Sequence, residues 1–437
     1  MTILTFPMSR IEGHARVVIE EEGGVVQSAD FQAMEMRGFR YFVIGTPSEQ
    51  MPVIVPRICG VCSTAHHVAS VKALEDLYGI TPPPIAEKIR EILLLGQLIQ
   101  NQATSLFLFT MPDRMDVNSI FAADDFDCCG LNDTNLTQSA LRVRKAGTDL
   151  ITLAGGQFIH PVKAVIGGVT SGIKRERADA MLKILDDVLP VAKGLFDCYW
   201  NLSLRLRDRI GTWGDDEPTY YLASTQDDDL TLNSERLRVM DPTGKEIAGF
   251  KPRDYQKHLI MEESRYSYAG ESSYQGQIIR ANSLARMNMA RKLNTPEADI
   301  YLQRFKQEFG DPAHAILLFD ICRGIELVYA IEKARQMLED NLEEGDVKVD
   351  YSIQDGVGYG LVEAPRGPLI HRYEVENGLI KDADFVIPTA HNMRAIRRAL
   401  MVVANRYISP NGINLELDKA VGRVVRAFDP CIACATQ

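Results

Sequence analysis

Two Cys-x-x-Cys pairs, one near each end of the chain, are the sequence feature that most constrains its fold. Cys59 and Cys62 form the first pair, and Cys431 and Cys434 form the second, close to Gln437. Four thiolates are soft ligands that suit nickel, zinc or iron–sulfur chemistry. Because Cys431 follows Cys62 by 369 positions, a site that uses both pairs forms only when the whole chain folds around it.

The composition is that of a large globular protein with an acidic surface. The chain has 437 residues, of which 46% are hydrophobic and 24% charged, which is enough to bury a large core. A net charge of −11, with no basic block, argues against a nucleic-acid partner. Eight cysteines in so long a chain do not suggest a disulfide framework, and the adjacent Cys128 and Cys129 are expected to be free and buried. With no signal peptide visible at Met1, we expect a reducing, cytoplasmic location.

One uncharged stretch, from Ile92 to Met111, is long enough to span a bilayer. Several glutamine, asparagine, serine and threonine side chains interrupt it, and the charged Arg90 and Glu91 precede it directly. Polar groups are costly in lipid. We therefore predict a helix buried in the protein core and no transmembrane segment.

The pattern of apolar residues predicts an α+β protein that is predominantly helical. Two strands around Glu21-Glu22-Gly23-Gly24 predict an N-terminal β-hairpin, and a long central helix is expected to follow Pro84 and to stop at Pro112. No linker or repeat divides the chain, so residues 1–437 are expected to form a single large unit. The other predicted helices are 141–153, 175–209, 297–309, 313–341, 391–406 and 415–427; the predicted strands are 15–20, 25–31, 347–353 and 359–362; and 211–280 are expected to form loops and short strands.

The two cysteine motifs resemble the signature motifs of the large, catalytic subunit of nickel–iron hydrogenases. The first reads Arg-x-Cys-Gly-x-Cys-x-x-x-His and ends at His66, and the second reads Asp-Pro-Cys-x-x-Cys and begins at Asp429. Four other segments match the same family in the same order: 10–14, 37–39, 363–367 and 388–392. The resemblance thus covers the whole chain and implies the fold of that subunit.

The resemblance implies a nickel ion held by Cys59, Cys62, Cys431 and Cys434. Cys62 and Cys434 would also bridge to an iron that carries carbon monoxide and cyanide, written NiFe(CN)2CO. Thiolates donate strongly to soft metals and can bridge two of them. The implied reaction is the heterolytic and reversible oxidation of H2 to protons and electrons.

The resemblance also implies roles for side chains around the metals. Glu12 would carry protons away from Cys434, although a surface carboxylate or a helix cap is the alternative. Arg366, following Pro365, would lie over the open side of the metals, with an ordinary ion pair as its alternative. The remaining implied roles are a hydrogen bond from Thr389 to cyanide, a hydrogen bond from His66 to a cysteine sulfur, and support of Arg366 or of the second motif by Asp429.

The sequence departs from the family at three positions. Arg40 stands where the family usually has glutamate, and Gln437 stands where it usually has histidine. In the family these two residues ligate a magnesium ion, so their joint replacement predicts that the magnesium site is absent. Arg40 would take its place by bonding the side-chain oxygen or the terminal carboxylate of Gln437; the alternative is that Arg40 turns outward and water fills the space. The third departure is Asn101, which stands where uptake enzymes often have aspartate.

Two other classes of protein could carry these motifs. A metal-free relative from respiratory complex I is one alternative, but such relatives lose the cysteines that this chain keeps. A structural zinc protein with four cysteine ligands is the other. Because the chain has no further cysteine-rich motif for an iron–sulfur cluster, the resemblance implies a partner, the iron–sulfur small subunit of hydrogenases. The resemblance also implies further electron-transfer subunits, linked to flavin, ferredoxin or nicotinamide, beyond the small subunit.

Overall fold

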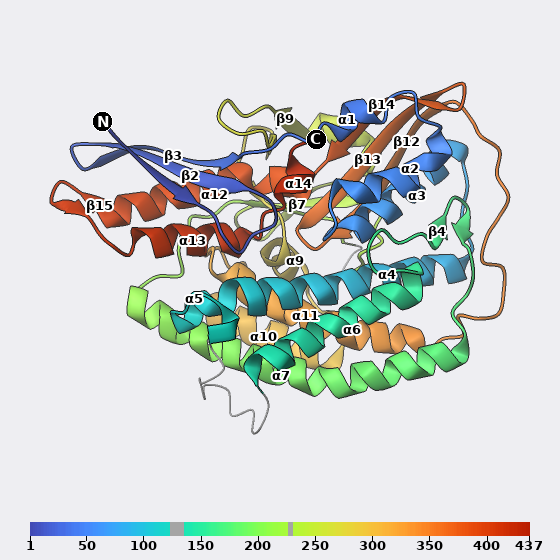
Figure 1. Cartoon of the computed structure of the whole chain (residues 1–437), viewed down its shortest axis with the longest axis horizontal. Coiled ribbons are helices and arrows are strands. Elements are labelled where there is room, and N and C mark those ends of the chain that lie inside the picture. The colour runs from blue at the N-terminus through green and yellow to red at the C-terminus, as the bar shows by residue number, and fades with distance from the viewer. Residues whose placement is uncertain (123–134, 226–229) are drawn as a thin grey trace.

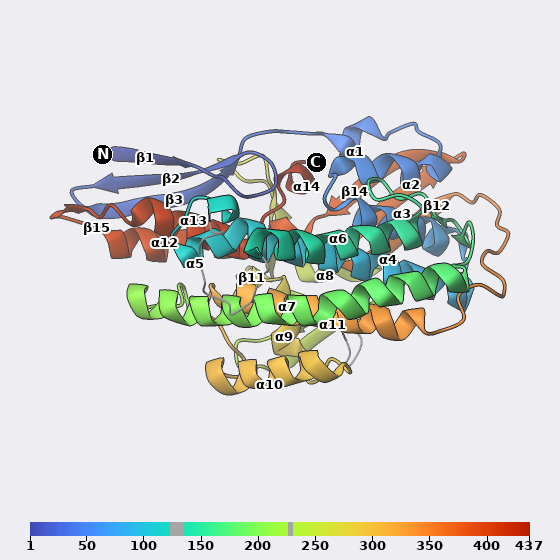
Figure 2. The same cartoon turned by 60° about the horizontal axis from the view of Figure 1, so that its bottom comes forward.

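The architecture is a group of helices packed beneath a second layer that combines helices with small sheets (Figures 1 and 2). The computed structural model describes residues 1–122, 135–225 and 230–437. Helix and strand are mixed with helix predominating, as predicted. Cys128 and Cys129 lie outside the described residues. Cys322 is buried and free.

The N-terminal sheet contains the predicted hairpin and one strand that was not predicted. The strands β1 (Thr2–Pro7), β2 (Ala15–Glu22) and β3 (Val25–Ala33) are antiparallel in the order β1-β2-β3. Alternate residues of β3 are buried, and this face packs against α12 (Pro388–Tyr407). The missed strand β1 is only six residues long and has no fully buried side chain, so its period-two signal is weak.

The long central helix continues past the predicted stop at Pro112. It consists of α4 (Pro84–Ala103), a π-helical stretch (Thr104–Thr110) and α5 (Met111–Met115). Pro112 occupies the first turn of α5, where a proline is tolerated because its missing N–H is not needed. Within the described residues this stretch, Pro84–Met115, is the one helix long and apolar enough to cross a membrane, and 83% of its most apolar window is buried inside the protein. That burial agrees with a core helix.

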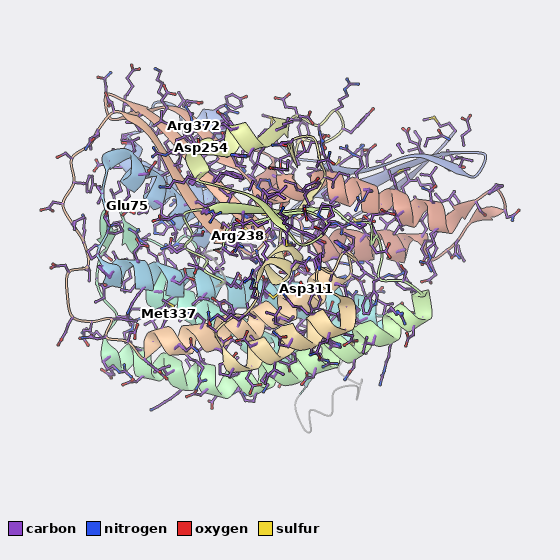
Figure 3. All side chains as sticks on the ribbon, turned by 180° about the vertical axis from the view of Figure 1, so that it is seen from behind. Glu75, Arg238, Asp254, Asp311, Met337 and Arg372 are labelled. Atoms are coloured by element: carbon purple, nitrogen blue, oxygen red, sulfur yellow. The ribbon has the colours of Figure 1, made fainter. Side chains whose placement is uncertain are left out.

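Four further helices complete the helical layer. They are α6 (Leu136–Gly155), α7 (Arg175–Ile210), α10 (Pro296–Phe309) and α11 (Leu318–Leu338). Seen from behind, side chains fill the space between the layers, with Met337 on α11 and Arg372 on the sheet of the other layer (Figure 3). Since α11 is buried on almost every side, it forms the centre of this layer.

The C-terminal half holds a second antiparallel sheet, of strands β12 (Gly356–Ala364), β13 (Gly367–Glu376) and β14 (Leu379–Val386). It extends the predicted strand 359–362, whereas the predicted strand 347–353 is wrong: only Lys348 there makes an isolated bridge. The remaining helices are α1 (Phe39–Phe42), α2 (Met51–Ile54), α3 (Ser63–Tyr78), α8 (Tyr255–His258), α9 (Ser283–Met289), α13 (Leu417–Phe428) and α14 (Ile432–Ala435). The remaining strands are β4 (Ala164–Val165), β5 (Gly168–Val169), β6 (Tyr220–Ala223), β7 (Leu237–Met240), β8 (Glu246–Phe250), β9 (Leu259–Glu262), β10 (Glu271–Tyr274), β11 (Ile279–Arg280), β15 (Ile408–Ser409) and β16 (Gly412–Ile413).

The C-terminus ends at α14, between the N-terminal sheet and the β12–β14 sheet (Figure 1). The first cysteine motif lies at the start of α3, which packs on β12 and β13. The fold therefore brings the two cysteine pairs, the N-terminal motif and the turn after β12 toward one place.

Candidate metal centre

The four cysteines converge on one buried site. Cys59 Sγ lies 3.4 Å from Cys431 Sγ, and Cys62 Sγ lies 3.7 Å from the same atom. All four sulfurs lie within 4.8 Å of one another, and none of the four residues is more than 6% exposed. The predicted convergence is confirmed, and its spacing suits one metal bound to all four thiolates.

The electrostatics of this pocket favour a bound cation. Burial raises the pKa of Cys431 and of Cys434 well above the usual value, whereas hydrogen bonds from Cys431 and Cys434 lower the pKa of Cys59 and Cys62. Four thiolates together would place several negative charges in a dry pocket, which is strongly unfavourable without compensation. The soft, buried donor set therefore fits the nickel site that the resemblance implies.

Glu12 reaches this site, but through a different cysteine than predicted. Its Oε2 accepts hydrogen bonds from Cys431 Sγ (3.1 Å) and from the amide of Ala433 (3.0 Å). The expected contact with Cys434 is thus replaced by one with Cys431. Burial raises the pKa of Glu12, and the Cys59 sulfur adds to this, while the two hydrogen bonds oppose it. The carboxyl group is placed to exchange a proton with the Cys431 sulfur.

The close approach of the N-terminal motif to the second cysteine motif requires glycine. Gly13 has φ +81°, and a Cβ added there would lie 2.7 Å from Ile432 Cβ. The backbone of Glu12 also accepts the amide of Ile432 at 3.2 Å. A side chain at position 13 would push Glu12 away from the cysteines.

Arg10 anchors the same motif to the π-helical stretch. It donates to the carbonyl of Phe109 (2.5 Å) and to Asp113 (2.6 Å), and Asp113 also accepts two hydrogen bonds from Arg426 on α13. The motif was recognised in the sequence, but this anchoring role was missed, because Asp113 belongs to no motif. π-Helical stretches often mark functional sites.

Arg366 lies beside the first cysteine pair, with Asp429 as its partner. Its Nη1 is 3.1 Å from Cys62 Sγ, and it donates to the Asp429 carbonyl (2.5 Å) and carboxylate (3.2 Å). Burial alone would lower the pKa of Arg366, but Asp429 and the cysteine sulfurs raise it overall, so the guanidinium stays charged. Asn101 donates to the other Asp429 oxygen (3.1 Å), and so supports Arg366 indirectly.

Thr389 contacts the second cysteine motif, and Pro365 lies next to Arg366 in the turn after β12. Thr389 Oγ1 accepts the amide of Cys431 at 3.0 Å, which leaves its own O–H free to donate. Pro365 is buried in the turn that presents Arg366. The hydrogen bond from Thr389 to cyanide stays a prediction, as does a contact of Pro365 with the cofactor.

His66 begins a hydrogen-bonded chain that leads away from Cys434. His66 Nε2 lies 3.4 Å from Cys434 Sγ, its Nδ1 lies 2.9 Å from His371 Nε2, and His371 Nδ1 lies 2.7 Å from the hydroxyl of Tyr373. Burial lowers the pKa of His66 to about 4 and that of His371 well below its usual value, so both rings are neutral. Tyr373 donates its own O–H to Ser70 Oγ at 3.0 Å, so its oxygen accepts from His371 Nδ1. His371 Nε2 then accepts from His66 Nδ1, which leaves His66 Nε2 as the acceptor that faces Cys434.

The partners of His66 were missed by sequence reasoning. His371 and Tyr373 lie on β13, where alternate residues face inward. Period-two alternation after the Arg366 turn would have placed both side chains on the buried face.

The predicted bond between Arg40 and Gln437 is wrong. The Arg40 side chain is 46% exposed and lies 3.9 Å from Asp384. Gln437 donates to the carbonyls of Ala433 (2.6 Å) and Cys434 (3.0 Å), and its buried Oε1 has no partner among the described residues. Arg40 points outward because α1 is a short turn of helix whose residues are all exposed or half-buried.

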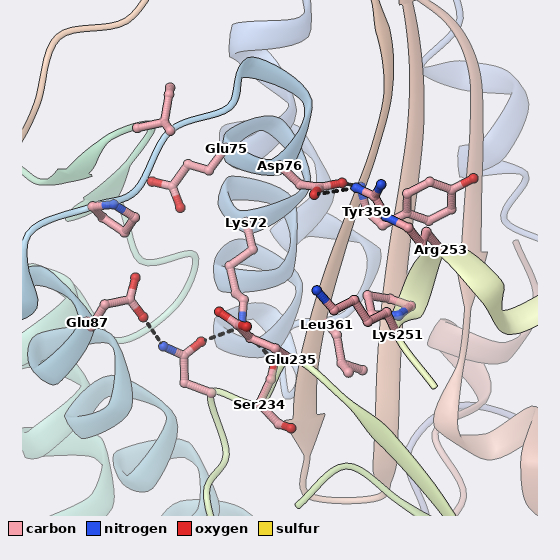
Figure 4. Close-up of a pocket in the computed structure, with 14 residues that line it drawn as sticks. Lys72, Glu75, Asp76, Glu87, Ser234, Glu235, Lys251, Arg253, Tyr359 and Leu361 are labelled. Atoms are coloured by element: carbon pink, nitrogen blue, oxygen red, sulfur yellow. Dashed lines mark hydrogen bonds and ion pairs between the residues drawn. The ribbon is translucent and has the colours of Figure 1, made fainter. Parts of the chain in front are cut away.

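A polar cavity of about 430 Å³ lies elsewhere, beside α3 (Figure 4). Acidic and basic side chains alternate around it: Lys72 donates to Asn233 and to the carbonyl of Ser234, and Arg253 pairs with Asp76 at 2.9 Å. None of the four cysteines lines it.

Comparison with known proteins supports the same assignment. The family model described as nickel-dependent hydrogenase matches residues 37–139 and 238–437, and a model described as HoxL-like matches 2–36. One subunit of the F420-non-reducing hydrogenase vhu of Methanocaldococcus jannaschii is 35% identical, covering 92% of this chain and 98% of the relative. The beta subunit of the NAD-reducing hydrogenase HoxS of Cupriavidus necator is 30% identical, covering 99% and 93%.

Solved structures agree with this relationship. The NAD⁺-reducing [NiFe]-hydrogenase in its H2-reduced state superposes with a TM-score of 0.93 at 28% identity, over 100% of both chains. The Ni-Fe-Se hydrogenase of Desulfomicrobium baculatum shares the fold, with a TM-score of 0.82 at 20% identity, again over 100% of both chains. The chain therefore belongs to the nickel-dependent hydrogenase family, as the catalytic large subunit of a multi-subunit [NiFe] hydrogenase.

Proposed function

We propose that this subunit cleaves H2 heterolytically and reversibly, H2 ⇌ 2H⁺ + 2e⁻, at a NiFe(CN)2CO centre. All four cysteines would hold nickel, and Cys62 and Cys434 would bridge to the iron. When bound, the metal pair supplies the electron-accepting side of the cleavage. The observation that carries the proposal is a buried cluster of four cysteine sulfurs with a carboxyl group against Cys431 and a guanidinium against Cys62.

The proton released from H2 leaves through Glu12. Glu12 is hydrogen-bonded to Cys431 Sγ and is only half-buried, so it connects a buried sulfur to the more open side of the N-terminal motif. Burial raises the pKa of this carboxyl group toward neutral pH. It can therefore take up a proton and release it more readily than an exposed carboxylate, whose pKa lies lower. Cys431 and Glu12 therefore form the first two positions of the proton path.

Arg366 and Thr389 shape the pocket on the iron side. The Arg366 guanidinium, charged and held by Asp429, presents a donor beside the Cys62 sulfur. The free O–H of Thr389 offers a second donor. A planar fork and a hydroxyl suit cyanide nitrogens as acceptors, and both groups exclude water from the metals.

Electrons leave through an iron–sulfur partner subunit. Four apolar side chains, Met34, Met36, Tyr41 and Phe42, are 43% to 70% exposed in the segment that approaches the C-terminal motif. Arg37 in the same segment donates its amide to Thr436, so the patch lies near the cysteines. The relatives named above reduce NAD or are F420-non-reducing, so a flavin-, ferredoxin- or nicotinamide-linked subunit beyond the iron–sulfur partner, and a cytoplasmic location, belong to this proposal.

The residues near Gln437 do not fit a magnesium ion. Arg40 stands in place of a carboxylate, and its side chain points outward. The side-chain N–H groups of Gln437 donate to two backbone carbonyls. Magnesium needs near-octahedral oxygen coordination, and a single unpartnered amide oxygen, Gln437 Oε1, falls well short. We therefore include the absence of magnesium in the proposal.

Metal analysis with infrared spectroscopy of the purified complex tests the function. Nickel and iron together, with carbon monoxide and cyanide stretching bands, are expected. Zinc alone without these bands would instead indicate a structural zinc site built from the four cysteines. Magnesium in equal amount to nickel would refute the proposed absence of magnesium.

A further inference from the structure

The turn that carries Arg366 is held from one side by an arginine that belongs to none of the family motifs identified in the sequence. Ala364 pairs with Gly367 at the end of the β12–β13 hairpin, so Pro365 and Arg366 are the two residues of the connecting turn. The whole turn is buried. Its carbonyl groups cannot reach water, and buried carbonyls need donors from the protein.

Arg286 on α9 supplies these donors. It donates to the carbonyl of Ala364 at 3.1 Å and to that of Pro365 at 2.8 Å. Arg286 has no exposed surface. The guanidinium of Arg286 therefore lies directly behind the peptide groups from which the Arg366 side chain departs.

Two buried carboxylates fix the guanidinium of Arg286. Glu326 on α11 accepts at 2.5 Å and 2.8 Å, and Glu363 on β12 accepts at 2.6 Å. Burial alone would lower the pKa of Arg286, but the two carboxylates raise it overall, so it stays charged. Glu326 is held in turn by Gln102 of α4 (2.5 Å).

The opposite side of the turn is also closely packed against its neighbours. Gly367 has φ +127°, and a Cβ added there would lie 2.8 Å from Ala281 Cβ. The turn thus lies between Arg286 and the Ala281 backbone segment, with little room to shift. Misplacement of a catalytic group by about 1 Å can cost about 100-fold in rate.

We propose that Arg286 positions Arg366 at the metal centre by holding the two carbonyl groups that precede it. This proposal rests on the role of Arg366 given above. It requires arginine rather than lysine at position 286, since only the planar fork binds two carboxylates and two carbonyls at once. Arg286 has no hydrogen bond to any of the four cysteines, and acts through Arg366.

The test is Arg286→Lys in the complete hydrogenase complex, with Arg280→Lys as matched control. Arg280 is also fully buried and paired with a buried carboxylate, Asp215, at 2.9 Å, but it is not bonded to the Arg366 turn. We expect Arg286→Lys to keep its nickel and iron, to shift the cyanide bands, and to lower kcat by about 10- to 100-fold with little change in KM. The control should leave the bands unchanged.

A double mutant separates positioning from general destabilisation. If Arg286 acts through Arg366, adding Arg286→Lys to Arg366→Lys should lower activity by no more than about two- to threefold further. The proposal would be overturned if the two single substitutions lowered activity independently, so that their fold-losses multiplied in the double mutant. It would also be overturned if Arg280→Lys shifted the cyanide bands as much as Arg286→Lys does.

A crystal structure of the variant gives a readout that needs no metal. Arg366 should move away from Cys62 and Asp429 in Arg286→Lys, or in the milder Glu326→Gln if the first variant does not fold. An unmoved Arg366 overturns the positioning role. A parent complex without cyanide bands would instead refute the proposed function, so the two failures are distinct.

Discussion

Replacing Glu12 with glutamine tests the proton path with a minimal change in shape. The glutamine Oε1 can still accept the Ala433 amide that Glu12 Oε2 now accepts at 3.0 Å, so the backbone of the second cysteine motif should stay in place. An amide cannot carry the proton offered by the Cys431 sulfur 3.1 Å away. General acid–base groups contribute about 10²–10⁴-fold, so turnover should fall by that factor, or about 2.7–5.4 kcal/mol in the barrier.

The assay should separate cleavage of H2 from exchange of the proton with water. Conversion of para-H2 to ortho-H2 requires only cleavage and recombination at the centre, whereas formation of HD from D2 in ordinary water also needs the proton path. In Glu12→Gln, we expect para–ortho conversion to persist while HD formation and dye-linked turnover fall together. Nickel and iron contents, measured on the same sample, should equal those of the parent.

A nearby carboxylate provides the control. Glu35 pairs with His14 at 2.7 Å, but both side chains are exposed, at 48% and 80%, and neither is bonded to a cysteine. Glu35→Gln should therefore retain parental exchange. If Glu12→Gln exchanged D2 with water at the parental rate, Glu12 would not be the first carboxyl group of the path.

Four further substitutions test other parts of the site. Arg366→Lys should assemble the metals but lose most activity, because lysine keeps the charge without the planar fork that joins Asp429 to the pocket; kcat and the cyanide bands check this. Gly13→Ala should destabilise the protein by about 1–3 kcal/mol and reduce nickel content, since its φ is left-handed and its Cβ would clash; thermal unfolding and metal analysis measure both. Tyr373→Phe should retain the metals and shift the infrared bands, since the histidine chain from Cys434 loses the hydroxyl that accepts from His371 at its far end; unchanged bands would contradict the chain. Arg40→Ala should change the free energy of unfolding by no more than about 0.5 kcal/mol and leave activity intact, because the side chain is exposed; chemical denaturation and a standard H2-uptake assay decide.

Residues in short motifs were predictable from sequence because the chemistry of each is tied to its spacing. The contacts of Asp429 with Arg366 and of His66 with a cysteine sulfur were both expected, and both are present. The direction of a side chain was less predictable. Arg40 was placed beside Gln437 by its position in a motif, yet α1 exposes it, and Glu12 contacts Cys431 rather than Cys434.

Residues outside the motifs needed the tertiary structure. A buried arginine such as Arg286 has the same sequence signature as a surface arginine, and its partners come from α11 and β12, far away in the chain. Pro112 predicted a helix end, but the π-helical stretch before it moved the proline into the first turn of a new helical segment. Both cases depend on packing that local propensity does not contain.

Because the two cysteine pairs lie near opposite ends of the chain, a metal bound by all four cysteines would cross-link nearly the whole polypeptide. Cys59 and Cys431 are 372 positions apart, so a metal that joins them closes one very long loop. In the chain-entropy treatment used for disulfides, closing such a loop destabilises the unfolded state by about 6 kcal/mol. Removal of the metal by a chelator should therefore cost this subunit much of its resistance to denaturant as well as its catalytic activity, and the loss would be felt as far away as the N-terminal strands.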